Sequence, residues 1–212
     1  MPTGTLADAV QEVPSKPTRL IIGITGASGV IYGVELLRAL RSLDVETHLV
    51  MTRAANLTLT HETDLSVSDV RRLASVSYPI NAVDAPAASG SFETAGMVVA
   101  PCSIRSLSAI ATGVTTDLLT RAADVVLKER RRLVLLVRET PLHLGHLRSM
   151  LAVAEMGAII APPVPAFYTH PKTLDDVVQH TVGRVLDLFG IDTGRLKRWG
   201  EPAPSYASPG DS

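Results

Sequence analysis

Arg138 and Glu139 are the residues best suited to chemistry, since they stand side by side directly after the apolar run 133–137. If that run is a strand of an open parallel sheet, both side chains lie at its carboxyl end, where ligands of such sheets bind. A guanidinium can bind a phosphate through two hydrogen bonds, and a carboxylate can accept or donate a proton. The pair therefore predicts a binding or catalytic position, with a surface ion pair as the alternative.

A glycine-rich turn, 23–29, follows a first apolar run at 19–25. Its small residues let backbone N–H groups approach an anion closely, although a tight turn alone would also require glycine. The spacing is G-x-x-G-x-x-G instead of the dinucleotide pattern G-x-G-x-x-G, and Thr52-Arg53 follow the second strand where an acidic residue would hold a ribose. A mononucleotide phosphate therefore fits better than NAD, and an NAD(P) dehydrogenase is the weakest alternative.

Ser103 and Ser106 repeat this pattern after a third apolar run, 96–100. Hydroxyl and N–H groups at a helix start suit a phosphate or the polar edge of a ring, and a plain N-cap is the alternative. The single cysteine, Cys102, stands beside apolar residues and is interpreted as core filling.

His143 and His146 have a spacing that could suggest a metal site. No third ligand accompanies them, so we expect no metal and interpret His143 as support for a helix start.

Arg121 and Lys128 are seven residues apart in an expected helix, 117–131, so they share a face. Lys128 also begins a charge run, which is typical of a solvated helix end. Tyr168 and Arg184 could bind a small phosphate ester with an apolar tail, while an amphipathic core position for Tyr168 is the alternative.

The composition indicates one domain with extra burial between subunits: 212 residues, 46% hydrophobic and 19% charged. A net charge of −1 gives no general attraction to nucleic acid or anionic membrane. We expect no membrane insertion, because no apolar run approaches about 20 residues. The single cysteine and the lack of a secretory signal favour a reducing, cytoplasmic location.

Short apolar runs alternate with helical stretches, which predicts an α/β fold with a doubly wound parallel sheet and helices on both faces. The expected domain is 19–199, between a flexible N-terminal arm, 1–18, and a flexible tail, 200–212. Strands are expected at 19–25, 46–51, 96–100, 133–137 and 158–161. Helices are expected up to about residue 43, at 54–61, 67–74, from about 106, and at 117–131, 143–156 and 174–189, with a loop at 75–90.

Sequence segments that cover nearly all of 19–189 resemble those of the UbiX-type flavin prenyltransferases and occur in the same order. The matching segments are GITGASGVIYG, ETHLVMTRAA, HETD, SGSF, MVVAPCSIRSLSAIATG, LLTRAADVVLKERR, LVLLVRETPLHLGHL, GAIIAPPVPAFYTHP and DDVVQHTVGRVLD. The resemblance implies a three-layer, Rossmann-like (flavodoxin-like) fold that binds FMN and needs no metal.

The activity implied by the resemblance is transfer of dimethylallyl from dimethylallyl monophosphate to N5 and C6 of reduced FMN. The product, prenylated FMN, would then serve a UbiD-type decarboxylase in ubiquinone biosynthesis or aromatic-acid decarboxylation. The family also implies a homo-oligomer, a dodecamer, with sites at subunit interfaces.

The matched motifs imply site residues by position. Flavin contacts are implied for Gly26, Ala27, Ser28, Thr52, Ser103, Ile104, Arg105, Ser106 and Arg138. Prenyl-phosphate contacts are implied for Tyr168 and Arg184, with Arg121 and Lys128 as further cations around the phosphate.

Catalytic roles follow in the same way. Glu139 matches the acid–base carboxylate, and Ser28 could position or protonate near N5. Glu62, in HETD, matches an active-site carboxylate that a neighbouring subunit can supply. The cations would stabilise the departing phosphate, and Tyr168 and Trp199 would offer π faces to an allyl group with cationic character.

Two other functions stay open at this point. One is an FMN-dependent oxidative decarboxylase of cysteine-containing peptides, against which RETPLH and PAFY argue. The other is a non-catalytic FMN carrier, which would have little use for the cluster of Arg121, Lys128, Tyr168 and Arg184.

Overall fold

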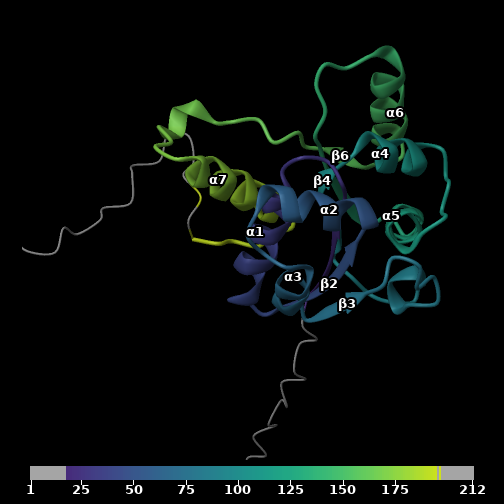
Figure 1. Cartoon of the computed structure of the whole chain (residues 1–212). Coiled ribbons are helices and arrows are strands. Elements are labelled where there is room, and N and C mark those ends of the chain that lie inside the picture. Colours follow the sequence, from purple (N-terminus) through teal and green to yellow (C-terminus); the bar gives the residue numbers. More distant parts are fainter. Residues whose placement is uncertain (1–17, 195, 197–212) are drawn as a thin grey trace, which may run out of the picture.

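The computed structural model describes residues 18–194 and 196. Within them, a six-stranded parallel sheet has the order β3-β2-β1-β4-β5-β6 (Figure 1). The strands are β1 (Thr18–Ile24), β2 (Val45–Met51), β3 (Val76–Tyr78), β4 (Gly96–Cys102), β5 (Arg132–Val137) and β6 (Ile159–Ile160). The strand order reverses between β1 and β4, and ligands of such sheets bind at this switch point. Trp199 and nearly all of the two expected terminal segments lie outside the described residues.

Helices cover both faces of the sheet, as predicted. One face carries α1 (Val30–Arg41), α2 (Arg53–Glu62), α3 (Val67–Leu73) and α7 (Leu174–Asp187). The other face carries α4 (Ile104–Ala111), α5 (Leu118–Lys128), α6 (Leu144–Glu155) and the short turn η1 (Pro86–Ala88). In β1, Leu20 and Ile22 pack into the first layer and Ile21 into the second. Burial on both faces explains why the strands are nearly continuous apolar runs.

The sequence prediction missed the edge strand β3, which lies inside the segment expected to be a loop. Val76 of β3 pairs with His48 of β2, and Tyr78 pairs with Val50. Three residues beside a polar segment are too short to show a strand period, so only the pairing with β2 identifies them. No helix among the described residues is long and apolar enough to cross a membrane.

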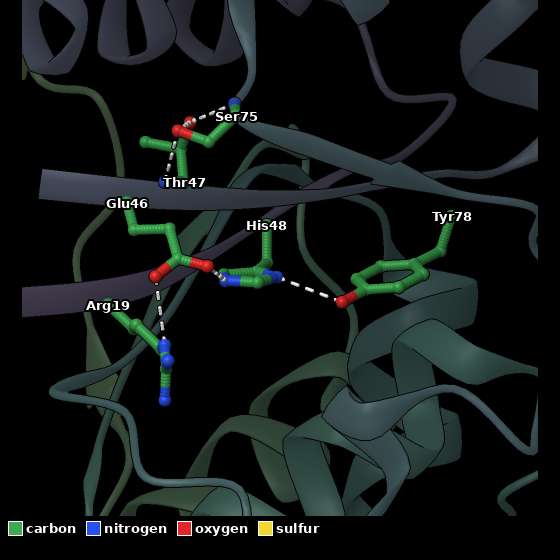
Figure 2. A network of polar contacts seen from close by, with 6 residues as sticks. All are labelled: Arg19, Glu46, Thr47, His48, Ser75 and Tyr78. Atoms are coloured by element: carbon green, nitrogen blue, oxygen red, sulfur yellow. Dashed lines mark hydrogen bonds and ion pairs between the residues drawn. The ribbon is translucent and has the colours of Figure 1, made fainter.

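A polar network joins the three strands on the β3 side of the sheet (Figure 2). Arg19 Nε donates to Glu46 Oε2 at 2.9 Å, Glu46 Oε1 lies 3.0 Å from His48 Nε2, and His48 Nδ1 lies 3.0 Å from the Tyr78 hydroxyl. His48 is 2% exposed. Burial lowers the pKa of His48, against the opposing influence of the Glu46 carboxylate. Burial within the network therefore favours the neutral form of this imidazole, which lies between β1 and β3.

Candidate active site

Three polar turns meet at the carboxyl edge of the sheet, after β1, β2 and β4. The buried Thr25 hydroxyl donates to Pro101 O at 2.7 Å and accepts from Ser103 N–H at 2.8 Å. Thr52 N–H donates to Ile24 O at 3.0 Å, which ties in the turn after β2. These bonds fix the loops at the switch point relative to one another.

Two glycines shape the turn after β1. Gly29 is the N-cap of α1 and has φ of 98°, a left-handed conformation that favours glycine. A Cβ on Gly26 would overlap the Cβ of Ala54, so the turn lies directly against the start of α2. Glycine at these two positions therefore allows the turn to pack against α2 and to lead into α1.

The N-caps of α2 and α4 add hydroxyl groups to this edge. The Thr52 hydroxyl accepts from Ala55 N–H at 3.1 Å, and the Ser103 hydroxyl accepts from Ser106 N–H at 3.3 Å. Ser103, one of the two expected caps, is thus the one that starts α4. Both hydroxyls stand at helix N-termini, where backbone donors favour an anion. The residues present therefore fit a phosphate-bearing flavin.

Glu62 occupies the N-terminus of α1. Its carboxylate accepts from Gly29 N–H at 2.9 and 3.1 Å and from Val30 N–H at 3.0 Å. Glu62 thus reaches the glycine turn of its own chain from the end of α2, and its role in the site of a neighbouring subunit stays a prediction. Because this carboxylate already satisfies the first donors of α1, the helix starts after β2 and β4 are better placed to bind a phosphate.

Arg138 lies at the same edge, directly after β5. Its backbone N–H donates to Cys102 O at 3.1 Å. Burial raises the pKa of the Tyr32 phenol, and the charge of Arg138 opposes this shift, so Arg138 lies near Tyr32. A Cβ on Gly29 would lie 3.1 Å from the Tyr32 ring, which places all three residues together.

Glu139 follows Arg138 and is exposed. Its Oε1 accepts from Thr140 N–H at 3.1 Å, a local contact that leaves the carboxylate open to solvent and to a ligand.

His143 is the N-cap of α6 and accepts from Gly145 N–H at 3.0 Å, as its interpretation as helix support required. Burial raises the pKa of the Cys102 thiol to about 12, which fits core filling.

Tyr168 and Arg184 line one cavity of about 330 Å³ beside β6. Tyr168 lies on the short turn η2 (Phe167–Thr169), and Arg184 lies on α7. The lining of the cavity combines apolar residues, among them Pro162, Val164 and Val185, with the polar residue Thr181. This combination is compatible with a small phosphate ester that has a hydrocarbon tail, so contact of Tyr168 and Arg184 with such an ester stays a prediction.

Lys128 lies at the opposite edge of the sheet from Arg138. It ends α5 four residues before β5 begins, whereas Arg138 follows the end of β5. A strand of this length spans roughly 17 Å. Arg121 pairs with Asp124 at 2.8 Å, and Lys128 pairs with Glu129. One chain therefore does not bring Lys128 to the flavin turns.

Two residues of this region were missed by the sequence reasoning. Thr25 joins the turns after β1 and β4, and its position directly before Gly26 of the glycine turn was the signal available in the sequence. His180 lines the cavity with Tyr168 and Arg184. Its place one helical turn before Arg184 was the available signal for His180.

The doubly wound sheet, with glycine and hydroxyl turns gathered at its switch point, defines a nucleotide-binding α/β protein. The Flavoprotein family model matches residues 9–186. Flavin prenyltransferase UbiX of Escherichia coli K12 is 62% identical over 174 residues, which are 82% of this chain and 92% of that protein. The chain belongs to the Flavoprotein family and, within it, to the UbiX-type flavin prenyltransferases.

Solved structures agree with this assignment. The crystal structure of AnUbiX (PadA1) in complex with FMN and dimethylallyl pyrophosphate is 50% identical with a TM-score of 0.87, covering 89% of this chain and all of that chain. A dodecameric FMN-dependent UbiX-like decarboxylase from Escherichia coli O157:H7 is 50% identical with a TM-score of 0.85, covering 87% of this chain and 100% of that chain. The FMN-dependent cysteine decarboxylase TvaF, at 18% identity and a TM-score of 0.56 over 79% of this chain and 99% of that chain, shares the fold alone.

Proposed function

We propose that this enzyme transfers dimethylallyl from dimethylallyl monophosphate to N5 and C6 of reduced FMN, which yields prenylated FMN. The observation that carries the proposal is the cavity lined by Tyr168 and Arg184, in a chain whose switch-point turns suit a flavin. A flavin carrier or an oxidative decarboxylase has no need of a cavity that pairs a guanidinium with an apolar wall. The family membership supports the same activity.

The flavin would be held by the turns at the switch point. Gly26, Ala27 and Ser28 would contact it after β1, and Thr52 after β2. After β4, the contacts would come from Ser103, Ile104, Arg105 and Ser106, and after β5 from Arg138. Bound reduced FMN would supply the nucleophilic N5 and C6, and Ser28 would hold a proton near N5.

The remaining residues would serve the prenyl phosphate. The allylic C–O bond breaks with its electron pair on the phosphate, so the departing group gains negative charge. Arg184, together with Arg121, Lys128 and Arg138, would stabilise that charge through charge-assisted hydrogen bonds. The π faces of Tyr168 and Trp199 would stabilise positive character on the allyl carbons. Glu139 would accept the proton that leaves C6 when the ring closes.

Glu139→Gln tests this base role directly. The amide cannot accept the proton, so we expect ring closure to slow by at least about 100-fold, within the range of general-base catalysis. Rapid-quench sampling with mass spectrometry and absorption spectra of the extracted flavin measures the rate of closure. Formation of the closed ring at the normal rate by E139Q would refute the role.

We further propose that the site is completed between copies in a homo-oligomer, a dodecamer like the relative from Escherichia coli O157:H7. The separation of Lys128 from Arg138 within one chain supports this assembly. So does the apolar stripe on α6, where Leu144, Leu147 and Leu151 are 60%, 49% and 60% exposed. Sedimentation of the purified protein tests the assembly. We also propose that the product, prenylated FMN, is delivered to a UbiD-type decarboxylase in the cytoplasm.

The decisive experiment is anaerobic incubation of the protein with reduced FMN and dimethylallyl monophosphate, followed by mass spectrometry of the extracted flavin. A parallel reaction with the diphosphate tests the donor. We expect a flavin heavier by one prenyl unit with the monophosphate. Unmodified FMN under verified reduction, with tight binding retained, would favour the flavin carrier instead. Oxidative decarboxylation of a peptide with a carboxyl-terminal cysteine would favour the decarboxylase.

A further inference from the structure

We propose that His180 is a positioning residue that orients the Tyr168 phenol in the cavity beside β6. In this orientation the Tyr168 hydroxyl can donate a hydrogen bond to the substrate phosphate. This inference rests on the proposed prenyl transfer, because it assigns a specific task within the same cavity. No motif in the sequence assigns a role to His180.

The geometry that carries this inference joins a loop to a helix. His180 Nε2 lies 3.3 Å from the Tyr168 hydroxyl, and the two rings meet edge to face with centroids 5.8 Å apart. Tyr168, His180 and Arg184 line the same cavity. Since His180 and Arg184 are four residues apart on α7, they share one face of the helix.

The position of Tyr168 explains why such a contact matters. Tyr168 is 43% exposed, and it lies on a three-residue turn after a segment rich in proline. The turn is closed by local bonds, from Thr169 N–H to Ala166 O at 3.2 Å and from His170 N–H to Phe167 O at 3.0 Å. Those bonds fix the backbone of the turn and leave the phenol direction to contacts made by its ring and hydroxyl. The imidazole provides both kinds of contact from α7.

The direction of the hydrogen bond determines what Tyr168 can do. If the phenol donates to Nε2, its proton is already used and cannot reach a phosphate oxygen. If Nε2–H donates to the phenol oxygen, the phenol O–H can itself donate to the phosphate, which offers only acceptors in its dianionic form. Phosphate binding therefore selects the Nε2-protonated form of His180. His180 then holds the Tyr168 hydroxyl in place, and Tyr168 and Arg184 bind the phosphate together.

The experiment compares steady-state kinetics of the full-length holoenzyme in four variants. H180F retains a ring without nitrogen, and H180Q can place an amide N–H near the position of Nε2. Y168F and the double variant H180F/Y168F close a thermodynamic cycle. Gln179→Ala is the matched control, since Gln179 is the adjacent residue on α7 and its amide donates to Glu35 at 2.8 Å.

We expect H180F to raise the KM for dimethylallyl monophosphate about 3- to 10-fold, the effect of one hydrogen bond, with kcat and FMN affinity little changed. H180Q should restore most of the loss, and H180F should add little in the Y168F background. A structural role alone would instead lower thermal stability and FMN affinity, and would persist in that background. If H180F does not fold, H180M replaces it in the cycle.

Two results would overturn the inference: an unchanged KM in H180F, or an effect of H180F that is equally large in Y168F. Both require a wild-type enzyme that turns over the prenyl phosphate. Failure of the wild-type enzyme to do so would instead refute the proposed function, so the two failures are distinguishable.

Discussion

Glu62 binds the backbone at the start of α1, where a dinucleotide-binding protein of this fold would place its pyrophosphate. The carboxylate accepts from Gly29 and Val30 and therefore acts as a cap supplied by another helix. Gly29 itself has no side chain to cap α1. Glu62→Ala should therefore lower the free energy of unfolding by about 1 kcal/mol, the usual effect of losing a helix N-cap.

Urea denaturation of the FMN-free protein at fixed protein concentration measures this loss. Asp64→Ala is a suitable control, because it removes a nearby carboxylate outside the cap. Equal destabilisation by both variants would show that Glu62 acts through general charge and does not cap α1.

His48 gives the protein a pH-dependent stability at the residue scale. Burial lowers the pKa of His48 in the folded state, so below its ordinary value of about 6.5 the unfolded chain binds a proton more readily than the folded chain does. Stability should therefore fall as pH drops through about 6.5. The hydrogen bond from Arg19 lowers the pKa of Glu46, and the stability that this contributes is lost only below about pH 4.3.

Denaturation midpoints between pH 5.5 and 7.5 check this expectation. His48→Gln should flatten the dependence in this window, whereas His61→Gln, which changes an exposed histidine, should leave it intact. Equal slopes for wild-type protein and H48Q would contradict the assignment.

At the scale of elements, Thr25 connects β1 to the start of α4. Its hydroxyl both donates to Pro101 O and accepts from Ser103 N–H, and it is fully buried. Thr25→Val keeps the shape but leaves both partners without this bond, so we expect a loss of about 1–3 kcal/mol in unfolding free energy. FMN affinity should fall as well, because Ser103 lies on a flavin turn.

Thr25→Ser retains the hydroxyl and should recover most of the stability and the affinity. Urea denaturation and FMN titration by fluorescence quenching measure the two effects. A fully stable T25V with normal FMN affinity would show that the turns are held by other contacts.

The elements that were predictable from sequence are those whose own residues determine them. The apolar runs of β1, β2, β4 and β5 are long enough to identify, and Ser103 and His143 mark the starts of their helices. In contrast, β3 exists through its pairing with β2, and Tyr168 meets His180 only because the segment after β6 returns to α7. Contacts that depend on such a return have no local pattern, so the sequence could mark Thr25 and His180 only by position, before the glycine turn and one helical turn before Arg184.

At the scale of the whole molecule, the family motifs identified cations that one chain keeps apart. Arg138 follows the end of β5 at the carboxyl edge of the sheet, whereas Lys128 precedes the start of the same strand. No rearrangement short of unfolding β5 would join them within one chain. If both residues serve one site, they must come from different copies.

This separation predicts complementation between two inactive variants. Lys128→Ala and Arg138→Ala should each lose at least about 10-fold in kcat/KM, because each removes a charge that stabilises the departing phosphate. In oligomers reassembled from an equal mixture, about a quarter of the sites would combine two intact residues, because each copy contributes to a different half of a shared interface. Activity should therefore rise to about a quarter of the wild-type value.

Reassembly from mild denaturant, followed by the anaerobic prenylation assay, measures this recovery. Mixing the variants without reassembly is the control and should give no gain. A mixture that stays as inactive as its components after verified exchange of subunits would show that Lys128 and Arg138 do not share a site across copies. Lys128 would then act elsewhere on the surface, and the proposed set of phosphate-binding cations would reduce to those at the carboxyl edge and in the cavity beside β6.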